Sequence, residues 1–253
     1  VSPTLKWERI QTLDIGGDFG FFNNELNISF DWYQRTTKDM LAPGQTMPDV
    51  LGAGAPKINA GTLRTRGWEL SIDWRHHFNE INVYANASIG DFKTVITKWD
   101  NDSQLLNENY SGKVYGDIWG FETDRYFTKD DFNADGSYKE GIASQKKLEQ
   151  DGFVYGPGDI KFKDLNNDKE INGGEGTVKD HGDLKVIGNT TPRYQYGFRL
   201  GGEWKGIDID MFFQGVGKCD AWTQSAFVMP MMRGADAIYA NQANYWTDEN
   251  PDP

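Results

Sequence analysis

The sequence has little of what several common folds and activities require. It holds one cysteine, Cys219, so no disulfide can form within the chain. It has no run of about 18 apolar residues, which excludes a membrane-spanning helix. Lys and Arg number 26 against 38 Asp and Glu, and the resulting net charge of −12 disfavours a polyanionic partner such as nucleic acid.

Recognisable catalytic and metal-binding motifs are also missing. No Gly-x-Ser-x-Gly, His-Glu-x-x-His or phosphate-cradling loop occurs. Of the three histidines, we expect the adjacent pair His76–His77 in a short turn, where the two side chains diverge and share no metal. Carboxylates such as Glu69 and Asp73 lie about 13 Å apart along one strand face, beyond the ~5–9.5 Å of a glycosidase pair. The sequence therefore predicts a protein that is not an enzyme.

What the chain does contain is strict alternation of apolar and polar residues. A period of two over many residues predicts β-strands rather than helices. The alternating segments form three pairs, each joined by a short turn: Thr12–Phe21 with Leu26–Thr36, Gly67–Arg75 with Ile81–Gly90, and Tyr194–Trp204 with Ile207–Gly215. Long polar segments separate the pairs. The sequence predicts an all-β, antiparallel architecture of about six strands.

The two faces of these strands differ in polarity. One face carries large apolar side chains such as Ile72, Phe198 and Leu200. The other face carries charge. If the strands form a membrane barrel, its charged side chains are expected to line a polar channel or to touch a plug domain: Asp14, Asp31, Glu69, Asp73, Arg193 and Arg199. A soluble β-sandwich with one wet face alternates in the same way, so alternation alone does not decide between a sandwich and a membrane barrel.

Aromatic placement and loop lengths favour the membrane barrel. Tyr194 and Trp204 bracket an apolar face that spans roughly 25 Å at the usual strand rise and tilt, which is the height of an outer-membrane apolar band. About a hundred residues separate the second pair from the third, whereas sandwich connections are commonly about 2–6 residues. Six strands do not close a barrel, since single-chain barrels start at ~8. We therefore expect residues 1–253 to be a fragment of a longer barrel protein.

Several stretches carry a family likeness. The chain resembles the SusC/RagA-like TonB-dependent transporters of Bacteroidota outer membranes, and the matching stretches follow the family's order along nearly the whole chain. They are Leu5–Glu8, Leu13–Phe21, Trp32–Leu41, Asn59–Leu70, Pro157–Asn166 and Phe212–Gly217. The resemblance implies a 22-stranded barrel filled by an N-terminal plug, of which this chain is a wall segment with long extracellular loops, residues 98–191 being the longest.

The resemblance also implies a function and partners. Such transporters import oligosaccharides or peptides across the outer membrane, beneath a SusD-like surface lipoprotein, with energy from the TonB complex acting through an N-terminal region that this chain does not contain. Membrane lipid would cover the apolar face. The alternative from a different class is a secreted β-rich carbohydrate-binding module, which would be soluble without detergent.

One loop matches the spacing of an EF-hand calcium loop. Oxygen ligands are expected from a curled loop of this kind, and the candidate metal ligands are Asp164, Asn166, Asp168, Glu170 and Glu175. The departure is Lys169, which occupies the position where the loop prefers glycine for a sharp turn. The alternative is an acidic surface turn satisfied by its own side-chain hydrogen bonds. No other cofactor is expected.

Aromatic residues outside the strands are candidates for substrate contact. Flat rings stack on sugar faces or on peptide side chains, and the candidates are Trp99, Trp119, Tyr126, Trp222 and Trp246. The alternative is that these rings pack the loops together or meet a lid protein.

Overall fold

The structure is a computed structural model that describes residues 5–43, 52, 57–223, 228–229, 238–247 and 249–251. The chain divides into two compact units. One comprises Val1–Gln104, Glu108–Asp117 and Asn189–Asp220, and the other comprises Leu105–Asn107, Ile118–Gly188 and Ala221–Pro253. No helix in the described part of the chain has the length and the hydropathy needed to cross a bilayer.

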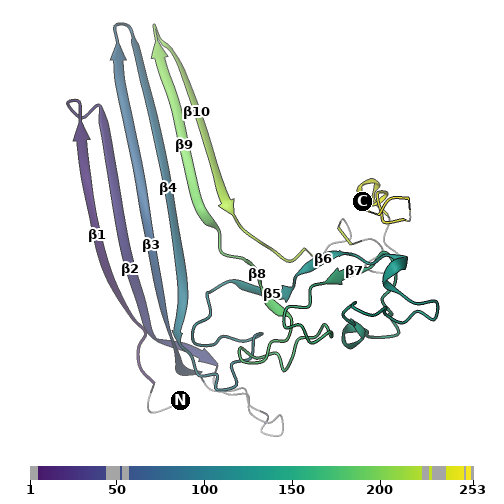
Figure 1. Ribbon diagram of the computed structural model, residues 1–253. Coiled ribbons are helices and arrows are strands. Elements are labelled where there is room, and N and C mark those ends of the chain that lie inside the picture. Colours follow the sequence, from purple (N-terminus) through teal and green to yellow (C-terminus); the bar gives the residue numbers. More distant parts are fainter. Residues whose placement is uncertain are drawn as a thin grey trace. The chain divides into compact units, whose positions relative to one another are not determined.

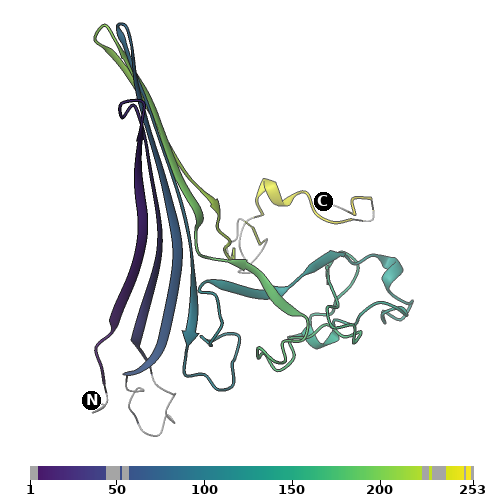
Figure 2. The same cartoon turned by 60° about the vertical axis from the view of Figure 1, so that its left-hand side comes forward.

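The first unit is built on one antiparallel sheet of six strands in the order β1-β2-β3-β4-β9-β10 (Figures 1 and 2). The three hairpins predicted from alternation are confirmed, and the third lies directly beside the second although a long connection separates them in sequence. The strands are β1 (Arg9–Phe21), β2 (Leu26–Pro43), β3 (Lys57–Phe78), β4 (Ile81–Lys98), β9 (Arg193–Trp204) and β10 (Ile207–Lys218).

Cross-strand register gives this sheet one apolar face and one polar face. Ile72 lies opposite Ile28 on one side and Ala87 on the other, and the same row continues to Phe198 and Phe213. The neighbouring row on the opposite face consists of Ser29, Ser71, Ser88, Gly197 and Gln214. Because the side-chain period is two, one register aligns all six strands and both faces are consistent across the sheet.

The apolar face is not covered by other parts of the described chain. Phe198 and Leu200 remain 40% and 42% exposed, and Ile72 is only half-buried. The buried hydrophobic residues lie elsewhere, namely Ala42, Ala60, Ile96, Leu106, Tyr110, Phe127, Phe132 and Ile171. A water-soluble sandwich would bury this face beneath a second sheet, so the structure favours a barrel wall.

The strands extend beyond the predicted limits, and one predicted turn is wrong. β3 continues to Phe78, and the chain reverses at Asn79–Glu80 with Asn79 in the left-handed region (φ 53°). Asparagine tolerates this conformation, so a turn of two residues suffices. His76 and His77 are therefore strand residues, and their rings contact different partners at 2.6 Å, Glu25 Oε2 and Asn82 Oδ1.

The second unit contains short strands that alternation did not predict. β5 (Asp117–Phe121) pairs with β8 (Leu184–Asn189), and β6 (Thr123–Tyr126) pairs with β7 (Ile160–Phe162). Single-turn 3₁₀ helices occur at η2 (Lys129–Asp131), η3 (Lys146–Leu148) and η4 (Ala240–Gln242). Strands of three to six residues are too short to show a period in the sequence.

An aromatic core and buried polar side chains hold this unit together. The fully buried Phe127 ring packs against Phe132, with their centroids 5.1 Å apart. The buried Gln145 amide accepts a hydrogen bond from Phe162 N–H at 2.7 Å and donates one to the Ile160 carbonyl at 3.1 Å. Gln145 thus gives two backbone groups of β7 a hydrogen-bond partner inside the unit.

Candidate functional site

The polar face of the six-stranded sheet carries a hollow of about 390 Å³. β2, β3, β4 and β9 all contribute to it, so it spans the middle of the sheet. Its lining is rich in hydroxyl and carboxyl groups: Ser29, Asp31, Tyr33, Glu69, Leu70, Ser71, Ser88, Ile89, Gly90, Asp91, Phe92 and Gln195. Of the residues predicted to line a polar channel, Asp31 and Glu69 meet here.

Asp31 and Glu69 lie directly opposite each other on β2 and β3. Like charges in such a pair repel, and no hydrogen bond or ion pair joins either carboxylate to another described residue. Glycine makes the arrangement possible, because a Cβ on Gly16 would lie 1.8 Å from the Asp31 Oδ1 atom. The hollow therefore offers two carboxylates whose hydrogen-bonding capacity is available to a donor from outside this chain.

Three of the charged groups on the polar face, Arg199, Asp210 and Asp73, are held by partners within the sheet. Arg199 Nε donates to both Asp210 oxygens at 3.0 and 2.7 Å, and the Tyr84 hydroxyl donates to the same carboxylate. The Asn86 amide donates to Asp73. Asp14, Asp31 and Glu69 instead form no hydrogen bond or ion pair with another described residue, and of these three only Asp31 and Glu69 line the hollow.

Arg193 is held by Asp91 in a two-pronged ion pair. Arg193 Nε and Nη2 donate to the two Asp91 oxygens at 2.5 Å each, and the Tyr194 N–H donates to the same carboxylate at 3.3 Å. The Asp91 side chain is only 8% exposed. The pair joins β4 to the start of β9, across the longest connection of the chain.

The five loop aromatics predicted to contact substrate lie against different neighbours. The Trp99 ring packs on Gly61 and the Trp246 ring packs on Gly158. A Cβ atom added to these glycines would lie 2.5 Å from the Trp99 ring and 2.7 Å from the Trp246 ring. Trp119 lies 5.4 Å from the His181 ring, measured between centroids. Tyr126 is half-buried in β6. Trp222 is 65% exposed beside Gly120, so it is the candidate most available to a ligand.

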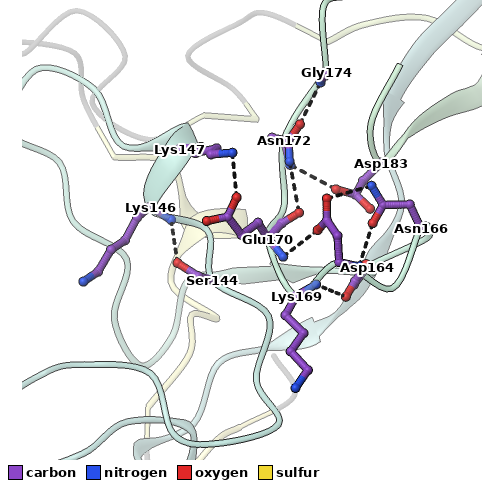
Figure 3. A network of polar contacts seen from close by, with 11 residues as sticks. Ser144, Lys146, Lys147, Asp164, Asn166, Lys169, Glu170, Asn172, Gly174 and Asp183 are labelled. Atoms are coloured by element: carbon purple, nitrogen blue, oxygen red, sulfur yellow. Dashed lines mark hydrogen bonds and ion pairs between the residues drawn. The ribbon is translucent and has the colours of Figure 1, made fainter. Parts of the chain in front are cut away.

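The predicted calcium loop forms a closed network of side-chain hydrogen bonds (Figure 3). Asp164 accepts from the N–H groups of Asn167 and Lys169 at 2.7 and 2.9 Å. Asn166 accepts from Asp168 N–H at 2.9 Å, and Asp168 accepts from Glu170 N–H at 2.8 Å. Lys169 adopts φ 68°, the left-handed conformation for which glycine is preferred at this position.

Ion pairing and ligand geometry bear on whether this loop holds a cation. Lys147 Nζ lies 2.6 Å from Glu170 Oε2, and Glu175 is exposed. In the described ranges no group of three or more His, Cys, Asp or Glu side chains is placed to hold a metal ion. The observed network is the one expected of a self-satisfied acidic turn, and calcium binding by these residues stays a prediction.

No sequence pattern marks Asp183, which closes this loop. Its side chain is fully buried and accepts from Leu165 N–H at 2.8 Å and from Asn172 N–H at 3.0 Å. A buried carboxylate is tolerated only where such donors replace water. Asp183 therefore ties together the two ends of the segment that carries the candidate metal ligands.

Two ion-pair clusters shift carboxyl pKa values in the same unit. Lys163 and Lys185 flank Glu122 and lower its pKa to about 2. Arg125 binds both oxygens of the buried Asp131 at 2.7 and 2.6 Å and lowers the pKa of that carboxyl to about 2. Both groups are satisfied by structural partners, so neither is a candidate for proton transfer.

Comparison with known proteins agrees with this geometry. A family model described as TonB dependent receptor-like, beta-barrel, matches residues 1–253. TonB-dependent receptor P3 of Formosa agariphila is 29% identical over 98% of this chain and 24% of its own length. TonB-dependent receptor SusC of Bacteroides thetaiotaomicron is 27% identical over 77% of this chain and 19% of its own length. The chain thus spans about a quarter or less of these relatives.

Solved structures share the fold. The RagAB peptide importer in its "open-open" state matches 99% of this chain and 25% of its own chain, with a TM-score of 0.67 and 22% identity. Members of the TonB-dependent receptor family are outer-membrane proteins. The uncovered apolar face, the polar hollow behind it and the match along the whole chain lead to one conclusion: the chain belongs to the TonB-dependent receptor family and forms part of its β-barrel wall.

Proposed function

We propose that this chain is a wall segment of an energised outer-membrane importer of oligosaccharides or peptides. The observation that carries the proposal is the two-faced sheet, in which an uncovered apolar face backs a polar face with a hollow of about 390 Å³. A wall of this kind keeps hydrocarbon on one side and a polar passage on the other. A secreted carbohydrate-binding module would leave this apolar face in contact with water, which is unfavourable.

The chemistry of the hollow supports a polar, uncharged or cationic substrate. Asp31 and Glu69 accept hydrogen bonds and repel anions, and Ser29, Ser71 and Ser88 both donate and accept. Sugar hydroxyls and peptide N–H groups are suitable donors to such carboxylates. RagAB, which shares the fold, is a peptide importer.

The partners follow from the same proposal. A SusD-like surface lipoprotein would cover the long loops outside the cell, where the exposed Trp222 ring is available for stacking on a substrate or on the lid. The TonB complex would supply the energy for import. Calcium, if bound at Asp164–Glu175, would stiffen a loop in this outer region.

The test is uptake by the complete transporter with its partner, in a host that lacks its own copy. Cells are supplied with defined oligosaccharides or with peptides, and uptake is compared between wild type and a variant carrying Asp31→Asn and Glu69→Gln. Glu80→Gln, which removes a carboxylate from the β3–β4 turn, is the matched control. We expect uptake to fall in the double variant and to be unchanged in the control.

Two results would contradict the proposal. One is a transporter that takes up neither class of substrate when the host supplies TonB. The other is a protein that stays soluble and monomeric without detergent, which is the behaviour of a secreted module.

A further inference from the structure

A group of cations lies on the apolar side of the sheet, just beyond its aromatic limit. Trp32 and Trp68 lie opposite each other and end the apolar rows toward the long connections. In the next row along the same face, Arg66 lies between Gln34 and Lys93, and in the row after that Arg64 lies between Thr36 and Val95. Arg64, Arg66 and Lys93 form what we call the basic row.

The basic row has no carboxylate partner within the described residues. Arg66 Nε donates to Gln34 Oε1 at 2.8 Å, and none of the three cations lies in an ion pair. The nearby carboxylates are taken, since Asp91 pairs with Arg193 and Asp39 pairs with Arg9. In a chain of net charge −12, such a concentration of unpaired positive charge is a local feature that overall composition hides.

The arrangement costs stability within this chain. Arg66 and Lys93 are directly opposite each other across β3 and β4, and like charges in that position are destabilising. Both side chains are exposed, so water and salt screen part of the repulsion. A counter-anion bound from outside the chain would relieve the rest.

The height of the basic row relative to the membrane indicates which anion lies close to it. The apolar face of β3 runs from Phe78 to Trp68, ten residues or roughly 33 Å of strand, which at ~40° tilt gives roughly 25 Å of height. This matches the apolar band of an outer-membrane barrel. Arg66 lies two residues further on, roughly 5 Å above the band, where lipid headgroups begin.

We propose that the basic row binds phosphate-bearing, anionic lipid headgroups in the membrane leaflet on the side of the long connections. The planar guanidinium groups of Arg64 and Arg66 match two phosphate oxygens each, and the Lys93 ammonium adds a point charge between strands. A zwitterionic headgroup carries its own cation and offsets this charge poorly. The site lies outside the barrel, so it is separate from import, and its failure would leave the proposed function untouched.

Lipid retention by the complete transporter tests this inference. The protein is extracted from vesicles of phosphatidylcholine mixed with phosphatidylglycerol, and lipid mass spectrometry measures the ratio of the two lipids that stay bound. Arg66→Gln is expected to lower the bound fraction of phosphatidylglycerol about fivefold, since a basic residue near an anionic surface contributes about that factor. Lys93→Gln provides the same test should Arg66→Gln fail to fold.

Arg35→Gln is the matched control, because Arg35 is an exposed arginine at nearly the same depth on the opposite face of the sheet. We expect retention of both lipids in this control to equal that of wild type. Equal retention of phosphatidylglycerol by wild type and the basic-row variants would overturn the inference. An equal loss in Arg35→Gln would also overturn it, because the effect would then follow from net charge and not from the basic row.

Discussion

Placing a charge at Ile72 is the sharpest perturbation of the proposed lipid contact. On β3, Ile72 lies four residues from Trp68 and six from Phe78, roughly 10 Å and 15 Å in height from the two aromatic limits at ~40° tilt. It is therefore near the middle of the apolar band. An arginine at the midplane of a barrel costs about 2–4 kcal/mol, so Ile72→Arg should lower the free energy of unfolding by that amount.

Ser71→Arg is the control at the same depth. Ser71 lies on the polar face opposite Ser29 and Ser88, and Glu69 on the same face offers a nearby carboxylate. We expect a much smaller loss there. The assay is urea-induced unfolding of the complete transporter in vesicles. The folded fraction is measured as the fraction that resists SDS without heating. Equal losses at the two positions, or no loss at Ile72, would refute the assignment of the faces.

Three further predictions concern the second unit. Arg125 lowers the pKa of Asp131 below its unfolded value, so the stability from this pair is fully present above about pH 4 and is lost as the pH falls toward about 2. The loss amounts to about 2 kcal/mol. Hydrogen exchange of peptides covering 123–132, corrected for intrinsic rates, should show this loss of stability in wild type but not in Arg125→Gln. Gln145→Leu removes the side-chain partner of Phe162 N–H and of Ile160 C=O and should cost about 1–3 kcal/mol of local stability by the same method. The exposed Gln150→Leu should be neutral. For the calcium prediction, calorimetric titration of the complete transporter should give heats that disappear in a variant with Asp164→Ala and Asp168→Ala; identical heats in the two proteins would reject it.

The fold of the sheet was largely predictable from the sequence because alternation reports directly which side chains share a face. Ile72 and Ser71 are adjacent in sequence and fall on opposite faces whatever the register of the strands. The sequence places the turn at Asn79 too early, because two polar histidines precede it and suggest a loop. The backbone conformation of Asn79, and not the polarity of the residues before it, sets where the chain reverses. Short turns also fix the register within a hairpin, so the pairing of Phe198 with Phe213 can be predicted from the position of the turn between their strands.

The candidate site was less predictable because it depends on register between hairpins. Asp31 and Glu69 belong to different hairpins that a long connection joins, so their direct opposition is not encoded in local spacing. The basic row arises in the same way. Arg66 and Lys93 come from β3 and β4, and only the aligned sheet shows that no carboxylate of a described residue pairs with them. Asp183 and Gln145 are single polar residues in irregular segments, where no period marks burial.

Spin-label accessibility at Ile72 and Ser71 tests the membrane placement most directly. Each position is changed to cysteine in a Cys219→Ser background and labelled in the complete transporter in vesicles. Collisions with lipid-soluble oxygen and with a water-soluble nickel chelate are then compared. We expect oxygen, but not nickel, to reach the label at 72, and we expect oxygen to collide much less often with the label at 71. A label at 72 that protein shields from oxygen, or that nickel reaches, would show that this face does not contact lipid.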